Sequence, residues 1–296
     1  MWSMASTPHD VKRCQSVARL IDAIAHREAV DNGVFALNND GTCGRIGAEL
    51  LSRGSTGPAA DKIINEYAKA AHTVVYGGLD EVYSGADEAV SAAISDDTFP
   101  AAHTLQLLGD ALDDEAKEKR AVEIASHMPN LSCVEIGSHE HALLLDAPAG
   151  EVWVFLERLQ AALVSRGRER SLTLCLDLVA NELTAPVHSK SSPCLWGRDS
   201  NDKLPPVEEV TITVSGFVDD DQLEQFYDNV MATLISSNDE LKGHEKTYVE
   251  LWDDELRTDF QRRFMAQQAS LNNSGGPYKL SFDGQGLRVE RRSAAT

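Results

Sequence analysis

Positive charge is scarce in this sequence, because 27 Lys and Arg residues stand against 47 Asp and Glu residues, a net charge of −20. Nucleic acids and anionic membrane surfaces both attract Lys and Arg, so this balance disfavours either of them as a partner. Apolar runs of roughly 18 residues, the length needed to cross a membrane, are also missing. The charge suits a protein with a basic protein partner.

Cysteine is scarce as well, with five residues and no Cys-x-x-Cys pair. An odd and dispersed set of cysteines is typical of reduced thiols rather than of a disulfide framework. Residues 1–14 contain no apolar stretch of the kind found in a secretory signal. We therefore expect a cytoplasmic or nuclear protein.

The common catalytic motifs are absent too. The sequence has no Gly-Lys-Ser/Thr phosphate loop and no Gly-x-Ser-x-Gly nucleophile elbow. The densest group of polar residues contains His139 and His141, followed by Asp146, and these three residue types can ligate a metal ion. A solvated loop explains the same residues more simply, so we expect no catalytic residues, no metal and no cofactor. A metal-dependent α/β hydrolase that uses these three residues remains the alternative.

What the sequence does contain is an internal repeat. The tetrapeptide Ala-Ala-His-Thr occurs at residues 70–73 and again at 101–104, and residues 128–137 have similar apolar spacing. The pattern apolar-x-x-apolar-x-apolar recurs at intervals of about 30 to 40 residues. Each copy predicts a short strand, and amphipathic stretches such as 223–235 predict helices between the strands. The central apolar residues of the copies are Leu37, Val74, Leu105, Val134, Leu172, Val210, Val249 and Leu280.

Strands that alternate with helices at this spacing predict an α/β fold with parallel strands. A doubly wound sheet buries both faces, so its strands are almost continuously apolar. Here polar residues separate the apolar ones, which indicates one face open to water and helices behind the other. This favours a solenoid of strand–helix units over a doubly wound or two-domain fold. The polar positions expected to line the open face are Thr104, Gln106, Glu135, Asp177, Thr211, Thr213, Tyr248 and Glu250.

Two segments carry a resemblance to a known family: Phe99-Pro followed by Leu105-Gln-Leu, and Met128-Pro-Asn-Leu-Ser-Cys-Val-Glu-Ile-Gly. They resemble leucine-rich repeats, and their irregularity is similar to that of fungal F-box/leucine-rich-repeat proteins. The resemblance implies an irregular leucine-rich-repeat-like solenoid. Residues 1–32 show no recognisable F-box and are expected to form an N-terminal helical cap. Residues 33–296 are expected to form one continuous repeat domain, closed by a C-terminal hairpin around Gly284 and Gly286.

These observations favour a non-enzymatic platform for protein–protein interaction, with a basic partner on the concave sheet. The resemblance implies substrate recognition, as in a ubiquitin-ligase receptor. Trp196, in the polar segment 188–206, is expected to be a further anchor because tryptophan is enriched in binding hot spots. A structural subunit of a larger assembly remains a further alternative.

Overall fold

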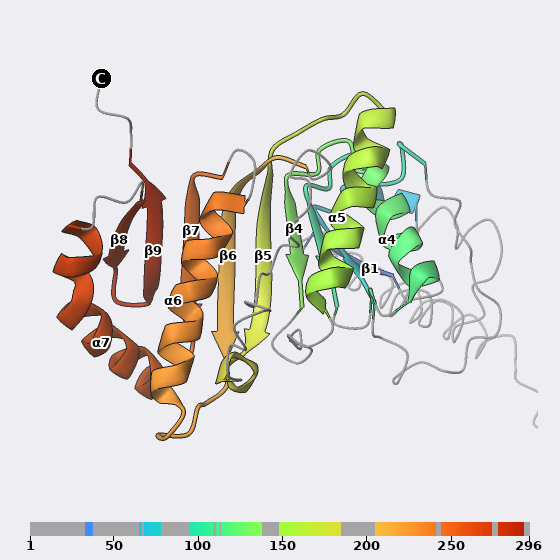
Figure 1. The fold of residues 1–296 in the computed structure, drawn as a ribbon. Coiled ribbons are helices and arrows are strands. Elements are labelled where there is room, and N and C mark those ends of the chain that lie inside the picture. The colour runs from blue at the N-terminus through green and yellow to red at the C-terminus, as the bar shows by residue number, and fades with distance from the viewer. Residues whose placement is uncertain are drawn as a thin grey trace, which may run out of the picture.

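The computed structural model describes residues 33–37, 65–66, 68–77, 95–108, 111–112, 114–137, 148–184, 205–240, 244–273 and 278–292. These residues contain a nine-stranded sheet with the order β1-β2-β3-β4-β5-β6-β7-β9-β8 (Figure 1). The strands are β1 (Val34–Leu37), β2 (Thr73–Tyr76), β3 (Thr104–Leu107), β4 (Cys133–Ile136), β5 (Leu172–Val179), β6 (Val207–Ser215), β7 (Lys246–Leu251), β8 (Tyr278–Phe282) and β9 (Gly286–Arg291).

Strands β1 to β7 are parallel, and each is hydrogen-bonded to the next one along the chain. The expected α/β fold with parallel strands is therefore confirmed. Over these described strands the order follows the sequence, without the reversal at which a doubly wound sheet changes direction.

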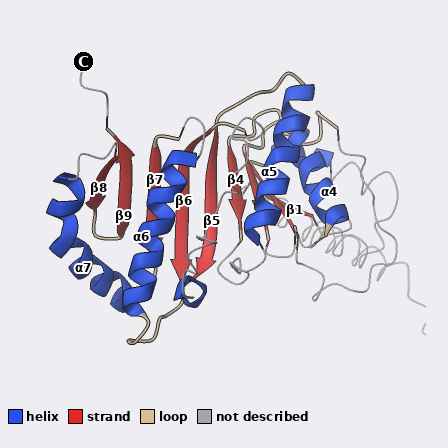
Figure 2. Cartoon of the chain, in the orientation of Figure 1, coloured by secondary structure: helices blue, strands red, loops and turns tan. Residues whose placement is uncertain are grey.

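Helices occupy the crossovers between the strands. Among the described residues they are α4 (Glu115–Ser126), α5 (Pro148–Ser165), α6 (Leu223–Glu240), α7 (Asp254–Asn273) and the short 3-10 helix η1 (Ala180–Thr184), and residues 65–66 and 68–70 before β2 are helical as well. Figure 2 shows α4, α5 and α6 in front of the sheet, and Phe260 on α7 contacts Phe226 and Tyr227 on α6. None of the described helices is long and apolar enough to span a membrane.

An aspartate side chain caps the N-terminus of two of these helices. The side chain of Asp114 accepts hydrogen bonds from the backbone N–H groups of Ala116 and Lys117, and Asp253 accepts one from Leu256. These bonds satisfy N–H groups that have no partner within the first turn of a helix. The acidic residues before α4 and α7 therefore have a structural role as caps.

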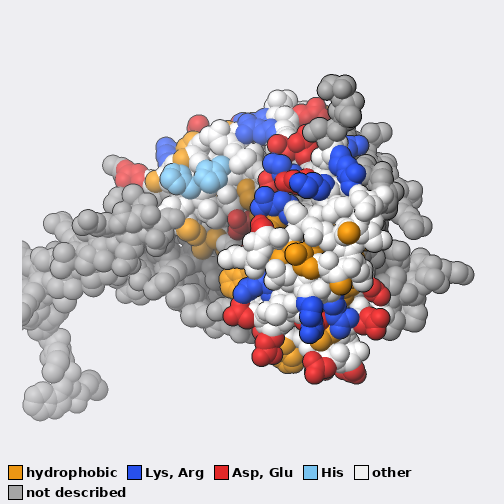
Figure 3. Space-filling view, turned by 90° about the vertical axis from the view of Figure 1, so that its left-hand side faces the viewer, with side chains coloured by type: hydrophobic (Ala, Val, Ile, Leu, Met, Phe, Trp, Pro, Cys, Tyr) orange, Lys and Arg blue, Asp and Glu red, His pale blue; other side chains and the backbone are white. Residues whose placement is uncertain are grey.

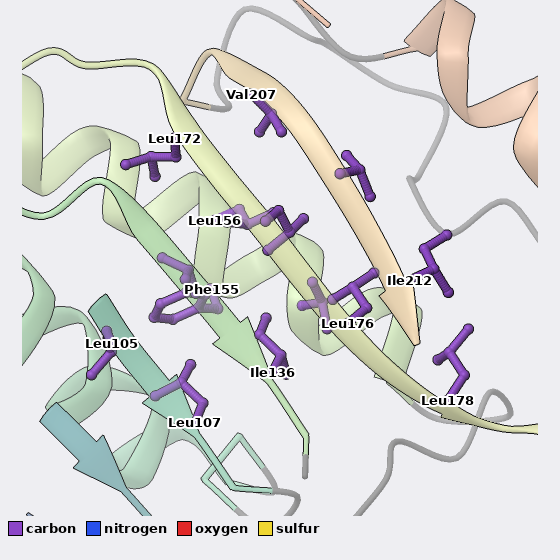
Figure 4. Close-up of a cluster of buried hydrophobic side chains, with 14 of the residues drawn as sticks. Leu105, Leu107, Ile136, Phe155, Leu156, Leu172, Leu176, Leu178, Val207 and Ile212 are labelled. Carbon is purple, nitrogen blue, oxygen red and sulfur yellow. The ribbon is translucent and has the colours of Figure 1, made fainter. Parts of the chain in front are cut away.

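The core lies between the sheet and the helices. In β5, Leu172, Leu174, Leu176 and Leu178 are buried, whereas the residues that alternate with them are half-buried. The buried residues form one cluster with side chains of α5, including Phe155 and Leu156 (Figure 4). Burying each such leucine contributes about 1.5 to 3 kcal/mol. Because successive side chains of a strand point to opposite faces, the half-buried residues lie on the face away from these helices.

Strands β8 and β9 form a hairpin around Gly284, where a closing hairpin was expected, and the strand order departs here from the repeat because β8 does not pair with β7. β9 pairs antiparallel with both β7 and β8, so it lies between them. β8 still runs in the same direction as β7, but the chain turns back at once through Gly284, whose φ is 97°. The carboxylate of Asp283 accepts hydrogen bonds from the N–H groups of Gln285 and Gly286 and fixes this turn. A tight turn of this kind joins antiparallel strands without a crossover helix.

Candidate functional site: the polar face of the sheet

The residues expected on the open face lie together on one side of the sheet. We call this side, opposite α4, α5 and α6, the polar face. Most of its residues sit between buried apolar neighbours of their own strand, and most are half-buried. Thr104 is the exception, because only 8% of its surface is exposed. Its hydroxyl oxygen lies 3.0 Å from Nδ1 of His103. The half-buried members are Gln106, Glu135, Asp177, Thr211, Thr213, Tyr248 and Glu250.

Strand register arranges these side chains in rows that cross the sheet. Asp177, Thr213 and Glu250 form one row over β5, β6 and β7. The neighbouring row is longer and crosses β3 to β9. Its members are Gln106, Glu135, Cys175, Thr211, Tyr248 and Arg288.

Negative charge collects in the middle of the polar face. The strands β3 to β6 present Glu135, Asp177 and Glu209 on it, and among their described residues they present no Lys, Arg or His. The described cations of this face are Lys246 on β7, Lys279 on β8 and Arg288 on β9, and Lys246 stands directly opposite Glu209. The centre of the face is therefore suited to bind a cation or a basic side chain.

Glu135 lies half-buried near the middle of this face. Burial raises the pKa of Glu135, and the charge of the neighbouring Asp177 raises it further. No described Lys, Arg or His forms an ion pair with Glu135. A cation bound beside Glu135 would stabilise its ionised form, because an opposite charge close by favours ionisation.

Two thiols lie beside Glu135. The sulfur atoms of Cys133 and Cys175 are 3.9 Å apart, and both side chains are half-buried. Their hydrogen bond raises the pKa of Cys133 and lowers that of Cys175, because the proton that stays on Cys133 is shared with the Cys175 thiolate. One ligand atom from each of Cys133, Glu135 and Cys175 lies within 4.8 Å of the other two. We call these three residues the thiol–carboxylate cluster.

A second group of side chains lies toward the C-terminal edge of the polar face. The hydroxyl of Tyr248 donates a hydrogen bond to Asp283 at 3.2 Å, and Arg288 forms an ion pair with the same carboxylate at 3.1 Å. The Arg288 guanidinium also lies over the Tyr248 ring, 5.6 Å from its centre. Burial, followed by the charge of Asp283, raises the pKa of Tyr248 to about 12. Tyr248 is thus a fixed hydrogen-bond donor at neutral pH and does not act as a base.

The end of the molecule formed by α7, β8 and β9 has a different charge pattern. Figure 3 shows acidic and basic side chains mixed over this end. The arginines of α7 form ion pairs within the helix, as Arg263 does with Asp259 at 2.7 Å. Ion pairs between residues four apart on a helix contribute only about 0.3 to 0.5 kcal/mol. The unmixed negative charge at β4 and β5 is therefore the more distinctive feature.

Other expected site residues lie outside the described residues: Trp196, and the alternative metal ligands His139, His141 and Asp146. Conversely, the thiol–carboxylate cluster was not among the predicted sites. The signal was present in the repeats, because aligning Val134 with Leu174 places Glu135 directly opposite Cys175.

Comparison of the chain with protein-family models, with curated proteins and with solved structures found no match.

Proposed function

We propose that this chain is a non-enzymatic platform for protein–protein interaction, and that its polar face binds a basic segment of a partner. The observation that carries the proposal is the negative charge of Glu135 and Asp177 on β4 and β5, two strands whose described residues present no Lys, Arg or His on this face. Charge complementarity of this kind speeds association and selects partners more than it adds affinity. Substrate recognition, as in a ubiquitin-ligase receptor, is the particular role that the resemblance to F-box/leucine-rich-repeat proteins favours.

The same proposal includes a solenoid of stacked strand–helix units. It is supported by the chain-order arrangement of β1 to β7 and by the position of α4, α5 and α6 on a single side of the sheet (Figure 1). In such an arrangement each unit packs only on its neighbours, and the strands share one continuous surface that helices do not cover. A partner segment lying across the strands would meet the rows of polar side chains in turn.

A charge-reversal variant tests the platform. Glu135→Lys, Asp177→Lys and Glu250→Lys together are expected to weaken binding of fluorescent Lys/Arg-rich peptides at least about tenfold, a loss of about 1.4 kcal/mol. Fluorescence anisotropy with a chelator present measures this binding without a contribution from metal. Raising the ionic strength from about 0.1 M to about 1 M shortens the screening length from about 10 Å to about 3 Å, so binding by the unaltered chain should fall as well.

A matched control separates the polar face from net charge. Glu224→Lys, Asp228→Lys and Glu255→Lys change the net charge equally, but at exposed positions on α6 and α7. This variant should keep most of the peptide binding, and Glu-rich peptides of the same length should not bind either protein. Equal losses in the two triple variants would show attraction by overall charge and would refute the assignment to the polar face.

A further inference from the structure

We propose that Cys133, Glu135 and Cys175 form a zinc-binding site on the polar face. The proposal does not rest on the protein-binding function, because it concerns the ligand geometry of three residues on two strands. Each of the three residue types is an established zinc ligand, and two sulfur ligands select zinc over magnesium or calcium.

The strands hold the three ligands on one side of the sheet. Cys133 and Glu135 are two residues apart on β4, so both side chains point to the polar face. Cys175 stands opposite Glu135 on β5, in a register fixed by the buried pair Val134 and Leu174. The ligands are therefore positioned by the core of the sheet and not by a loop, and little has to be ordered when an ion binds.

The separation of the two sulfur atoms matches a tetrahedral zinc ion. With Zn–S bonds of about 2.3 Å, two sulfurs at the tetrahedral angle lie about 3.8 Å apart. The sulfurs of Cys133 and Cys175 are 3.9 Å apart, and a carboxylate oxygen of Glu135 lies within 4.8 Å of both. One ion can contact both sulfurs where they stand, and rotation about the side-chain bonds of Glu135 can bring its carboxylate to the same ion without a shift of either strand.

The same register disfavours a disulfide between the two thiols. Cys133 is opposite Thr173, so Cys175 is its diagonal neighbour rather than its direct partner. Diagonal neighbours across two strands are about 7 to 8 Å apart, whereas the Cα atoms of a disulfide are usually about 4.4 to 6.8 Å apart. A zinc ion can bridge this longer distance, because two Zn–S bonds take the place of the single S–S bond of a disulfide.

Charge also favours a divalent cation at this position. On binding, each thiol releases its proton to solvent, so the two thiolates and the Glu135 carboxylate bring three negative charges to Zn²⁺. The charge of Asp177 lies close enough to Glu135 to add to the effect of burial in raising its pKa, and it adds to the attraction for the ion. Three protein ligands leave the fourth position of the ion to water or to a donor group of a partner.

Metal titration of the reduced full-length chain tests the site. The chain is stripped of metal and titrated with Zn²⁺ against a chromophoric chelator, and we expect one ion to bind. Cys133→Ser with Cys175→Ser should weaken this binding at least about 100-fold, because the loss of ligands exceeds the 10- to 100-fold cost of losing an outer hydrogen-bond partner. With Co²⁺ in place of Zn²⁺, a thiolate-to-cobalt charge-transfer band should appear and should vanish in this double variant.

The remaining cysteines supply the matched control. The triple variant Cys14→Ser, Cys43→Ser and Cys194→Ser should retain both zinc binding and the cobalt band. If it loses them while the double variant keeps them, the ion is held elsewhere and the proposal is wrong.

A measurement on the unaltered chain covers the case in which the double variant fails to fold. Bound Zn²⁺ should protect two thiols from alkylation, and mass spectrometry should locate them at Cys133 and Cys175. Protection at other cysteines, or none at a saturating concentration of zinc, would overturn the site. Glu250→Gln, a carboxylate of the same face on β7, should leave the protection unchanged, whereas Glu135→Gln should weaken it.

Discussion

Replacement of Gly286 by alanine is expected to destabilise the protein by about 3 kcal/mol, the upper part of the range for overpacking a tight contact. A Cβ atom at Gly286 would overlap the carbonyl oxygen of Val249 and would lie 2.8 Å from its carbonyl carbon. Both are backbone atoms of β7, which have no side-chain rotamer to change. Alanine therefore fits only if β9 moves away from β7, at the cost of the hydrogen bonds that attach the C-terminal hairpin.

Gly284 provides the control for this prediction. It has a φ of +97°, but a Cβ atom there would meet nothing within 4 Å. Gly284→Ala should therefore cost only backbone strain, about 1 kcal/mol. Urea unfolding followed by circular dichroism gives both free energies, and hydrogen exchange locates the loss in β8 and β9. Equal destabilisation by the two variants would contradict the steric explanation.

The apolar pattern predicted which face of each strand is buried, even where it placed the register wrongly. Val74, Leu105 and Val134 were aligned correctly, and they pair in the sheet. The alignment was wrong by two residues elsewhere: Phe35 rather than Leu37 pairs with Val74. A shift of two residues leaves every side chain on the same face, because the period of a strand is two. The polar residues were thus placed on one face without a correct register.

Contacts between side chains need the register itself, which is why the sequence analysis missed the thiol–carboxylate cluster. It aligned Leu172 with Val134, whereas the structure pairs Leu174 with Val134. In the first alignment Thr173 stands opposite Glu135, and Cys175 lies two residues beyond. Only the observed pairing brings Cys175 beside Glu135 and puts its sulfur atom in contact with that of Cys133.

The order of the last strands could not be derived from strand patterns alone. The apolar residues at 277–282 fit the repeat, and the direction of β8 agrees with it. What decides its position is the turn through Asp283 and Gly284, which reverses the chain before a crossover can form. Turn residues therefore carried information that the repeat pattern did not contain.

Acid is expected to destabilise the protein through His244, which is only 1% exposed. Its Nε2 atom lies 2.6 Å from the hydroxyl of Thr247 at β7. Burial, followed by the positive charge of Arg291, lowers the pKa of His244 to about 4. In the unfolded chain this pKa returns to about 6.5.

The sign of the effect follows from these two values. Between pH 6.5 and about 4 the unfolded chain binds a proton on His244 that the folded chain does not, so the free energy of unfolding falls as the pH falls. The loss is about 1.4 kcal/mol per pH unit within this window, or about 3 kcal/mol in total. Above about pH 8 the residue is neutral in both states and should not affect the slope.

Urea unfolding at several values between pH 4.5 and pH 8 measures this contribution. His244→Gln retains a hydrogen-bonding group near Thr247 but has no proton to bind, so its stability should depend less steeply on pH below 6.5. Carboxylates that titrate in the same range are present in both proteins, and their effect cancels in the difference between the two curves. Parallel curves would mean that His244 binds its proton as readily in the folded chain as in the unfolded one. That result would mean that the side chain of His244 is in contact with water. It would contradict the buried position of His244 beside Thr247 at the start of β7.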